Sequence, residues 1–356
     1  MGCGASTPEM SEMEKAATFR ERRLSISQVP AQGAPRKRRL SIYGSAVQEG
    51  QPSEVQSPCA ACGCKTMEGL QPVPGGATSK INQDRGIAIY PWRNDPKVGL
   101  FGVYDGHGRA GEKVSEFVIQ NLPDTLKELM EQGAHTGSAL SEAYIRVDDD
   151  LGRKVDSSVS GTTAVTMLIK NNHLWIANSG DSRAIVVRKK RVGLQAIDLT
   201  IDQKPDTPAE MRRILRMGGH VTPPGANGSP SRVWHNLRGL AMARSIGDHA
   251  AATVGVIADP EISEYDCIPA DYAIVIASDG VWEFLSSQNV ADIIASVKSG
   301  DVQEMSELIV QKASDMWMVE EGDYRDDITV VILKLPWIPE TSVVPTANGN
   351  EGLAEP

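Results

Sequence analysis

Aspartates stand at the ends of several apolar segments of this 356-residue chain. The segment "FGVYDGHG" reaches Asp105 after an apolar run, and "VIASDGVWE" reaches Asp279 in the same way. A third run, "YRDDITVV", begins with Asp326 and Asp327, and Asp84 in "KINQDRG" precedes a fourth. An unpaired carboxylate beside an apolar strand is costly, and several carboxylates together repel one another. A divalent cation is the simplest way to hold such acids together.

The residue types indicate which cation this would be. No matching set of Cys or His accompanies the acids, and oxygen ligands favour Mg²⁺ or Mn²⁺ over Zn²⁺. Gly106 has no Cβ, so its carbonyl can approach an ion closely. Two ions that share a water can ionise it near neutral pH, and His107 beside them could protonate a leaving oxygen. One Asp-Gly pair alone is only a turn signal, so the argument depends on the recurrence of acids at separate strand ends.

The elements that must position these acids are short, Val/Ile-rich segments separated by turn residues. Tight turns such as "NN" at 171–172 favour antiparallel sheets with helices on their outer faces. We expect strands over 86–90, 98–104, 162–169, 173–178, 183–188, 272–278 and 327–335, and helices over 109–132, 138–152, 207–217, 287–298 and 301–318.

Composition divides the chain into a body and two tails. Residues 1–78 are rich in Ser, Pro, Gly and Gln, so we expect a disordered tail there and a second one over 339–356. Residues 79–338 are expected to form one domain. Residues 1–50 hold eight cations and five acids, a net +3, which leaves −13 on the rest of a chain whose total is −10. The acidic body argues against nucleic-acid binding.

Three further features bound the class of protein. Five cysteines, an odd number in a chain of this length, indicate a reducing compartment. We find no apolar run of the ~18 residues that a membrane helix needs, and no signal-peptide core at the N-terminus. The thiols in "CAACGC", Cys59, Cys62 and Cys64, are too few for a closed zinc site, and their role stays open between acylation, redox chemistry and no function.

Seven motifs, in order across residues 76–335, carry a resemblance to a known family. They are "KINQDR", "GVYDGHG", "SGTTAV", "LWIANSGDSRA", "LAMARSIGD", "VIASDGVWE" and "RDDITVVIL". The series resembles that of the type 2C metal-dependent protein serine/threonine phosphatases. The resemblance implies an α+β fold, with a central sandwich of two antiparallel sheets flanked by helices in one catalytic domain. It also implies hydrolysis of phosphoserine and phosphothreonine by direct attack of a hydroxide that bridges two Mg²⁺ or Mn²⁺ ions.

The resemblance also implies roles for individual residues. Asp105, Asp279 and Asp326 match direct metal ligands, and Gly106 contributes its carbonyl. Asp84 matches an acid that holds metal-bound water. The remaining matches are His107 as general acid, Asp181 and Glu283 at a third, weaker metal position, and Asp327 at a position that is often Asn and so a poorer ligand.

The substrate-binding side departs from part of the family. Some members carry an arginine that grips the substrate phosphate where this chain has Ser79, and the nearest cation is Lys80. Lysine lacks the bidentate fork of arginine, so phosphate binding would depend more on the metals. Residues 202–238 resemble the family's flap. Within it Lys204, Arg212, Arg213 and Arg232 could steer a phosphopeptide, or could simply form a solvated loop.

The N-terminal residues "MGCGAS" predict lipid attachment. Gly2 fits a myristoylation site and Cys3 a palmitoylation site. One acyl chain anchors only weakly, and the second chain or the basic residues Arg36–Arg39 would complete the anchor. We therefore expect the protein at the cytoplasmic face of a membrane, with a cytosolic pool.

The same tail repeats Arg-Arg-Leu-Ser, in "RERRLSIS" and "RKRRLSIY". Both copies look like substrates of a basophilic kinase, which would phosphorylate Ser25 and Ser41. Added negative charge could weaken attraction to anionic lipid. The alternative is a solvated basic tail or a docking arm.

An active, monomeric protein phosphatase is the leading hypothesis. Its rival is a catalytically inactive relative that acts as a scaffold or a phosphoprotein-binding module. Intact metal acids favour the enzyme, because inactive relatives usually lose them. A metallonuclease would also use acids with Mg²⁺, but a body of charge −13 is a poor surface for a polyanion.

Overall fold

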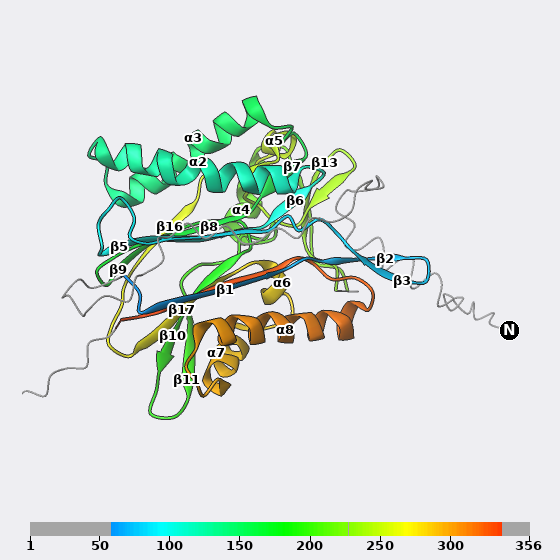
Figure 1. Ribbon diagram of the computed structural model, residues 1–356. Helices are drawn as coiled ribbons and strands as arrows, with labels where there is room; N and C mark the ends of the chain where they lie inside the picture. The colour runs from blue at the N-terminus through cyan, green and yellow to red at the C-terminus, as the bar shows by residue number, and fades with distance from the viewer. Residues whose placement is uncertain (1–57, 227, 337–356) are drawn as a thin grey trace, which may run out of the picture.

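Two five-stranded antiparallel sheets form the centre of the molecule (Figure 1), a computed structural model that describes residues 58–226 and 228–336. The first sheet has the order β1 (Ala61–Met67), β18 (Ile328–Lys334), β17 (Asp271–Ala277), β10 (Arg183–Lys189) and β11 (Leu194–Asp198). The second has the order β16 (Glu261–Asp266), β9 (His173–Ser179), β8 (Ala164–Lys170), β5 (Val98–Tyr104) and β4 (Arg85–Ile89).

The two-residue period of a β-strand places alternate side chains on opposite faces of each sheet. In β5, Phe101 and Val103 enter the core between the sheets, whereas Leu100 and Tyr104 face the helices outside. β18 does the same on the other sheet, with Val331 inside and Val330 outside. Because both faces of these strands are buried, their sequences are apolar throughout instead of alternating.

Helices cover both outer faces of the sandwich (Figure 1). α2 (Gly111–Glu131) and α3 (Thr136–Lys154) pack on the second sheet, and α7 (Ser287–Ser296) and α8 (Val302–Glu321) on the first. Ser286 caps α7, as its serines predict, by accepting the Asn289 backbone N–H at 3.1 Å. The result is the predicted α+β sandwich flanked by helices. None of the helices in the described part has the length and apolar character needed to cross a membrane.

The expected N-terminal boundary at residue 79 is wrong. β1 pairs with β18 along its whole length, and the hairpin of β2 (Leu70–Val73) and β3 (Gly76–Ser79) follows it. The sequence did not predict β1 as a strand, because "ACGCKTM" lacks the Val/Ile content of the other strands. Cys62 and Cys64 pack against the core between the sheets. The remaining tail positions, including residues 1–57 and 339–356, lie outside the described residues.

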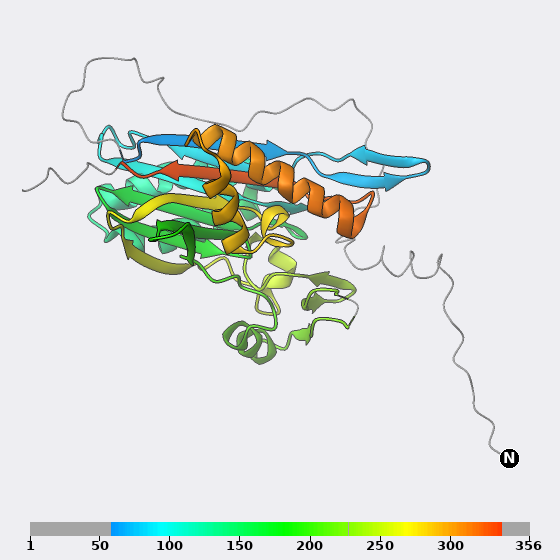
Figure 2. The same ribbon diagram turned by 90° about the horizontal axis from the view of Figure 1, so that it is seen from below.

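A smaller unit extends from the sandwich (Figure 2) and corresponds to the predicted flap. It contains α4 (Pro208–Arg216), β12 (His220–Thr222), β13 (Arg232–His235) and β14 (Arg238–Leu240), around a small apolar core of its own. Beside the ends of the large sheets lie β6 (Gly106–Gly108), β7 (Ser160–Thr162), β15 (Ile246–Gly247), α5 (His249–Ala252) and α6 (Asp279–Trp282).

Candidate active site

Strand ends bring the predicted acids together. Asp105 follows β5, Asp279 begins α6 just after β17, and Asp84 immediately precedes β4. Asp105 lies close enough to its neighbours that their charges act on it. Burial is the main cause that raises the pKa of Asp105 well above its usual range, and the next causes are the charges of Asp84, Asp279, Asp326 and Asp181. We call these five aspartates the acid cluster.

The acid cluster is short of hydrogen-bond donors. Burial, followed by the charges of Asp181 and Asp326, raises the pKa of Asp279 well above its usual range. One buried carboxylate oxygen of Asp279 and one of Asp181 have no hydrogen-bond partner among the described residues. Unsatisfied, buried carboxylates that repel one another are costly unless a cation compensates them.

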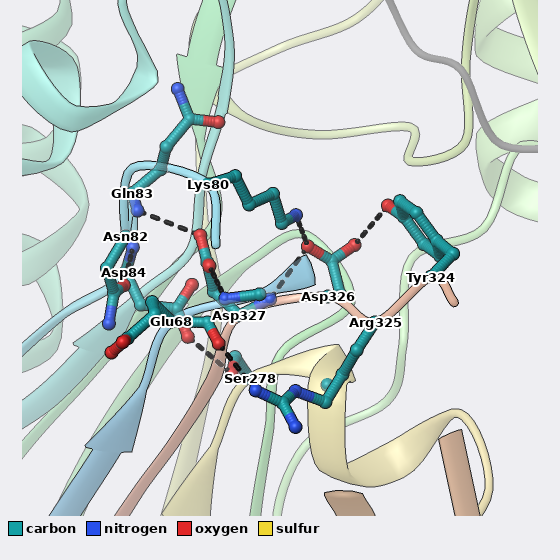
Figure 3. Close-up of polar contacts among 12 residues, drawn as sticks. Glu68, Lys80, Asn82, Gln83, Asp84, Ser278, Tyr324, Arg325, Asp326 and Asp327 are labelled. Carbon is teal, nitrogen blue, oxygen red and sulfur yellow. Dashed lines mark hydrogen bonds and ion pairs between the residues drawn. The ribbon is translucent and has the colours of Figure 1, made fainter. Parts of the chain in front are cut away.

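Two lysines provide part of that compensation. The Lys80 Nζ lies 2.5 Å from Asp326 Oδ1 (Figure 3), and its ammonium is 5.4 Å from the centre of the Tyr324 ring. Lys204 forms an ion pair with Asp181. In the described part of the chain no three His, Cys, Asp or Glu side chains already form a set that could hold a metal. Each lysine occupies one carboxylate oxygen, Oδ1 of Asp326 and Oδ2 of Asp181, and Asp181 Oδ1 has no hydrogen-bond partner among the described residues.

The cluster nevertheless suits a hard divalent cation. Its donors are carboxylate oxygens, which Mg²⁺ and Mn²⁺ prefer. Gly106 adds a backbone carbonyl beside Asp105, and a Cβ there would come within 2.4 Å of the Gly111 carbonyl oxygen and 2.6 Å of the Gln83 carbonyl oxygen. Glycine is therefore required at position 106 by close packing. The residues present fit the metal that the sequence predicts.

Asp327 has a different function from its neighbour. Its Oδ1 accepts the Gly69 N–H at 2.5 Å and its Oδ2 accepts the Gln83 N–H at 2.8 Å (Figure 3). These bonds hold the segment before Asp84 against the start of β18. Asp326 is therefore the acid of the pair that faces Lys80. Asp84 is oriented by the Ser278 hydroxyl, which donates to its Oδ2 at 2.8 Å.

His107 lies in β6, and its Nε2 is 2.5 Å from Asp248 Oδ2. Burial lowers the pKa of His107, but the charge of Asp248 and their hydrogen bond outweigh it and raise the pKa above its usual value. Asp248 is itself buried and accepts a second bond from the Ser245 hydroxyl at 2.8 Å. The position is the last residue of "LAMARSIGD", yet sequence reasoning did not single it out. The signal in the sequence that could have indicated Asp248 is its place as an acid directly after a glycine in a short apolar motif.

The backbone around Asp248 is held on several sides. Asp248 has a left-handed conformation, φ 49°, which is uncommon for a residue other than glycine. Its N–H donates to the Ser160 carbonyl at 3.0 Å, and the Gly247 N–H donates to Asp148 Oδ1 at 2.6 Å. The structure therefore fixes the carboxylate that contacts His107.

The other predicted residues separate into several groups. Glu283 follows α6, and its charge contributes to the raised pKa of Asp279. Arg212 is exposed on α4, and among the described residues we find no ion pair between it and the acid cluster. The sequence left Arg213 open between steering a phosphopeptide and lying in a solvated loop; its guanidinium lies 2.6 Å from Glu210, which also binds Arg244. The predicted modification sites, Gly2, Cys3, Ser25 and Ser41, lie outside the described residues.

Comparison with known proteins gives a consistent result. The family model described as Protein phosphatase 2C matches residues 77–321. "Probable protein phosphatase 2C 35" of Arabidopsis thaliana is 33% identical over 278 residues, 72% of this chain and 79% of that protein. "Probable protein phosphatase 2C 72" of the same plant is 36% identical over 276 residues, 72% of this chain and 82% of that protein. A solved serine-threonine phosphatase 2C from Toxoplasma gondii shares the fold, with TM-score 0.68 and 20% identity over 79% of this chain and 96% of that one.

Proposed function

This chain belongs to the protein phosphatase 2C family and is a protein serine/threonine phosphatase, and we propose that its acid cluster holds the Mg²⁺ or Mn²⁺ ions with which it works. The observation that carries the proposal is the lack of any hydrogen-bond partner for buried oxygens of Asp181 and Asp279 within the described residues. Such oxygens are available to a cation and are costly without one.

Three aspartates and one carbonyl would hold two ions: Asp105, Asp279 and Asp326 with the Gly106 oxygen. When bound, the ions would supply an activated hydroxide for direct attack on phosphorus and would neutralise phosphate charge. Asp84, whose carboxylate accepts a hydrogen bond from the Ser278 hydroxyl, would hold an ordered water. Asp181 and Glu283 would serve a third, weaker ion.

Protein side chains would handle the phosphate and the leaving group. His107 would act as general acid and protonate the leaving serine or threonine oxygen, with Asp248 fixing its ring. Lys80 would turn from Asp326 towards a substrate phosphate oxygen, since its ammonium lies at the edge of the acid cluster. Arg212, which is exposed on α4, remains a second candidate for binding substrate.

The activity and its metal dependence can be tested together. Purified protein should hydrolyse a phosphoserine peptide and p-nitrophenyl phosphate with added Mn²⁺, lose both activities in EDTA, and regain them on readdition of Mn²⁺. Calorimetric titration should show Mn²⁺ binding that is weakened in Asp105→Asn. Full activity in EDTA would overturn the metal mechanism. Binding of phosphoproteins without hydrolysis of either substrate would favour the inactive scaffold instead.

We further propose that acylation at Gly2 and Cys3 tethers the phosphatase to the cytoplasmic face of a membrane. The proposal is supported by the sequence "MGCGAS" and by the basic residues that follow it. Phosphorylation of Ser25 and Ser41 by a basophilic kinase would weaken the electrostatic part of that attachment.

In cell fractionation, Gly2→Ala should move the protein from the membrane fraction to the cytosol. Ala5→Gly, which leaves Gly2 and Ser6 in place, is the matched control and should stay with the membrane. An unchanged distribution of Gly2→Ala would remove the anchoring proposal without affecting the phosphatase assignment.

A further inference from the structure

The β2–β3 hairpin projects from the body of the molecule (Figures 1 and 2). Lys80 directly follows β3, and its N–H donates to the Gly69 carbonyl at 3.0 Å, which continues the hairpin ladder by one pair. The same Lys80 reaches Asp326 with its ammonium. The base of the hairpin is therefore at the edge of the candidate active site, and its tip extends into solvent.

The register shows which peptide groups point outwards. Because Gly69 and Lys80 are hydrogen-bonded to each other, the next bonded pairs are Gln71 with Thr78 and Val73 with Gly76. The residues between them direct their N–H and C=O groups away from the partner strand. These residues are Leu70 and Pro72 on β2, and Ala77 and Ser79 on β3.

The two edges of the hairpin differ. Leu70 exchanges both of its backbone bonds with Arg325, at 2.8 and 3.1 Å, and Pro72 has no N–H to offer, so the β2 edge is closed. On β3, Ala77 and Ser79 are exposed, and we find no hydrogen bond from their backbone groups to any other described residue. The β3 edge is thus open to another strand.

The hairpin also lacks the usual protection of an exposed edge. Residues 69–79, "GLQPVPGGATS", contain no charged side chain, and β3 contains no proline. Both faces of β3 are largely exposed, and a two-stranded ribbon of this kind is only marginally stable alone. A third strand would therefore add backbone hydrogen bonds at an edge where it displaces no described residue.

We propose that the β3 edge, residues 76–79, binds the main chain of the phosphoprotein substrate. An extended segment next to the phosphorylated residue would pair with Ala77 and Ser79 as a third strand. We identify the bound chain as substrate because the β3 edge leads into the candidate active site. A chain paired with Ser79 would continue directly to Lys80 and Asp326. Ile81, whose side chain is 58% exposed, offers an apolar contact to the same segment. Main-chain pairing is tolerant of sequence, so it would serve many substrates. This inference rests on the proposed function.

Backbone N-methylation of a phosphoserine peptide tests the pairing from the substrate side. Methyl groups placed one at a time along the flanking residues should raise KM by about 3- to 10-fold at alternate positions, the effect of one lost hydrogen bond. The positions between them should tolerate methylation. Equal effects at all positions, or no effect at any, would overturn the proposal.

A variant tests the same pairing from the enzyme side. Ala77→Pro removes an outward N–H but none of the bonds between β2 and β3, and Ala77→Ser is the matched control that keeps the N–H. Each variant's kcat/KM for the phosphopeptide is divided by its value for p-nitrophenyl phosphate, which has no main chain. The ratio should fall by about 3- to 10-fold in Ala77→Pro and stay unchanged in Ala77→Ser.

The failures can be told apart. An unchanged ratio in Ala77→Pro would overturn edge pairing while leaving the phosphatase intact. A concentration-dependent dimer that Ala77→Pro abolishes would assign the edge to a second copy of this chain and would also overturn it. If the unmodified protein with Mn²⁺ hydrolysed neither the phosphopeptide nor p-nitrophenyl phosphate, that result would instead contradict the proposed function.

Discussion

The two ends of β17 carry buried acids in opposite situations. Asp271, 0% exposed at the start of the strand, accepts bonds from Arg188 Nε at 2.6 Å, the Tyr265 hydroxyl at 2.9 Å and the Ile268 N–H at 2.9 Å. Asp279, just beyond the other end, has a buried oxygen without a hydrogen-bond partner in the described part of the chain. The first charge is compensated by the protein, and the second requires compensation from outside.

This difference separates structural acids from functional ones. A buried carboxylate whose lone pairs are all used stabilises a fold through its partners but cannot bind anything else. A buried carboxylate left without donors, among others of the same charge, lowers stability and retains its capacity to bind a cation. Composition cannot distinguish Asp271 from Asp279, since both flank the same apolar strand.

The largest expected effect is on turnover. Asp279→Asn should lower kcat for a phosphoserine peptide by about 10³-fold, because metal ions supply several kcal/mol of transition-state stabilisation. Asp271→Asn, the same chemical change at the other end of the strand, should leave kcat within about 3-fold when assayed well below its unfolding temperature, a margin of less than 1 kcal/mol. Comparable losses in both variants would break the distinction between the two acids.

Asp248 extends the comparison, because it is a buried acid at the active end whose Oδ2 is bound by two side chains, His107 and Ser245. Asp248→Asn loses the charge-assisted bond that fixes His107, so hydrolysis of the phosphoserine peptide should fall by about 100-fold. Hydrolysis of p-nitrophenyl phosphate should change little, since p-nitrophenolate leaves without a proton. Steady-state kinetics on both substrates measure the split.

The control for this prediction is the variant His107→Ala. In that background Asp248→Asn should add no further loss, because the residue it positions is gone. An equal fall on both substrates would show instead that Asp248 only stabilises the fold.

Sequence reasoning predicted most where an apolar strand and an acid are adjacent in the sequence. The apolar strands β5 and β17 run into Asp105 and Asp279, and β18 begins just after Asp326, so these acids could be predicted together with the strands that position them. It failed where tertiary pairing decides the outcome. β1 is a strand because β18 offers it an edge, and its own composition does not predict it.

The site shows the same limit. Asp248 lies 141 positions from His107, and only the fold brings their side chains within 2.5 Å. Likewise Arg213 is a cation that could steer a substrate, but its guanidinium binds Glu210 on the same helix and donates to the Gly255 and Ala243 carbonyls, which fixes α4 in place. The roles of charged residues depend on partners that are distant in sequence, and no local pattern specifies these partners.

A smaller effect is expected on stability at the far end of β17. Asp271→Asn should lower the free energy of unfolding by about 2 kcal/mol, because it weakens a charged hydrogen bond and removes the negative charge that pairs with Arg188. Urea unfolding followed by tryptophan fluorescence measures the loss. Glu128→Gln, at an exposed position of α2, is the control for loss of one acidic charge and should change stability by less than about 0.5 kcal/mol.

The smallest effect has the opposite sign and comes from the active end. In EDTA, Asp279→Asn should raise the free energy of unfolding by about 1 kcal/mol, because it removes one charge from a cluster whose members repel one another. Thermal unfolding should show a rise of about 2–4 °C, and saturating Mn²⁺ should reverse the order, since the unmodified protein gains more from binding the ion. Asp279→Asn could instead prove as destabilising in EDTA as Asp271→Asn. The fold itself would then need the Asp279 charge, which would contradict the view that this acid is kept for binding a cation.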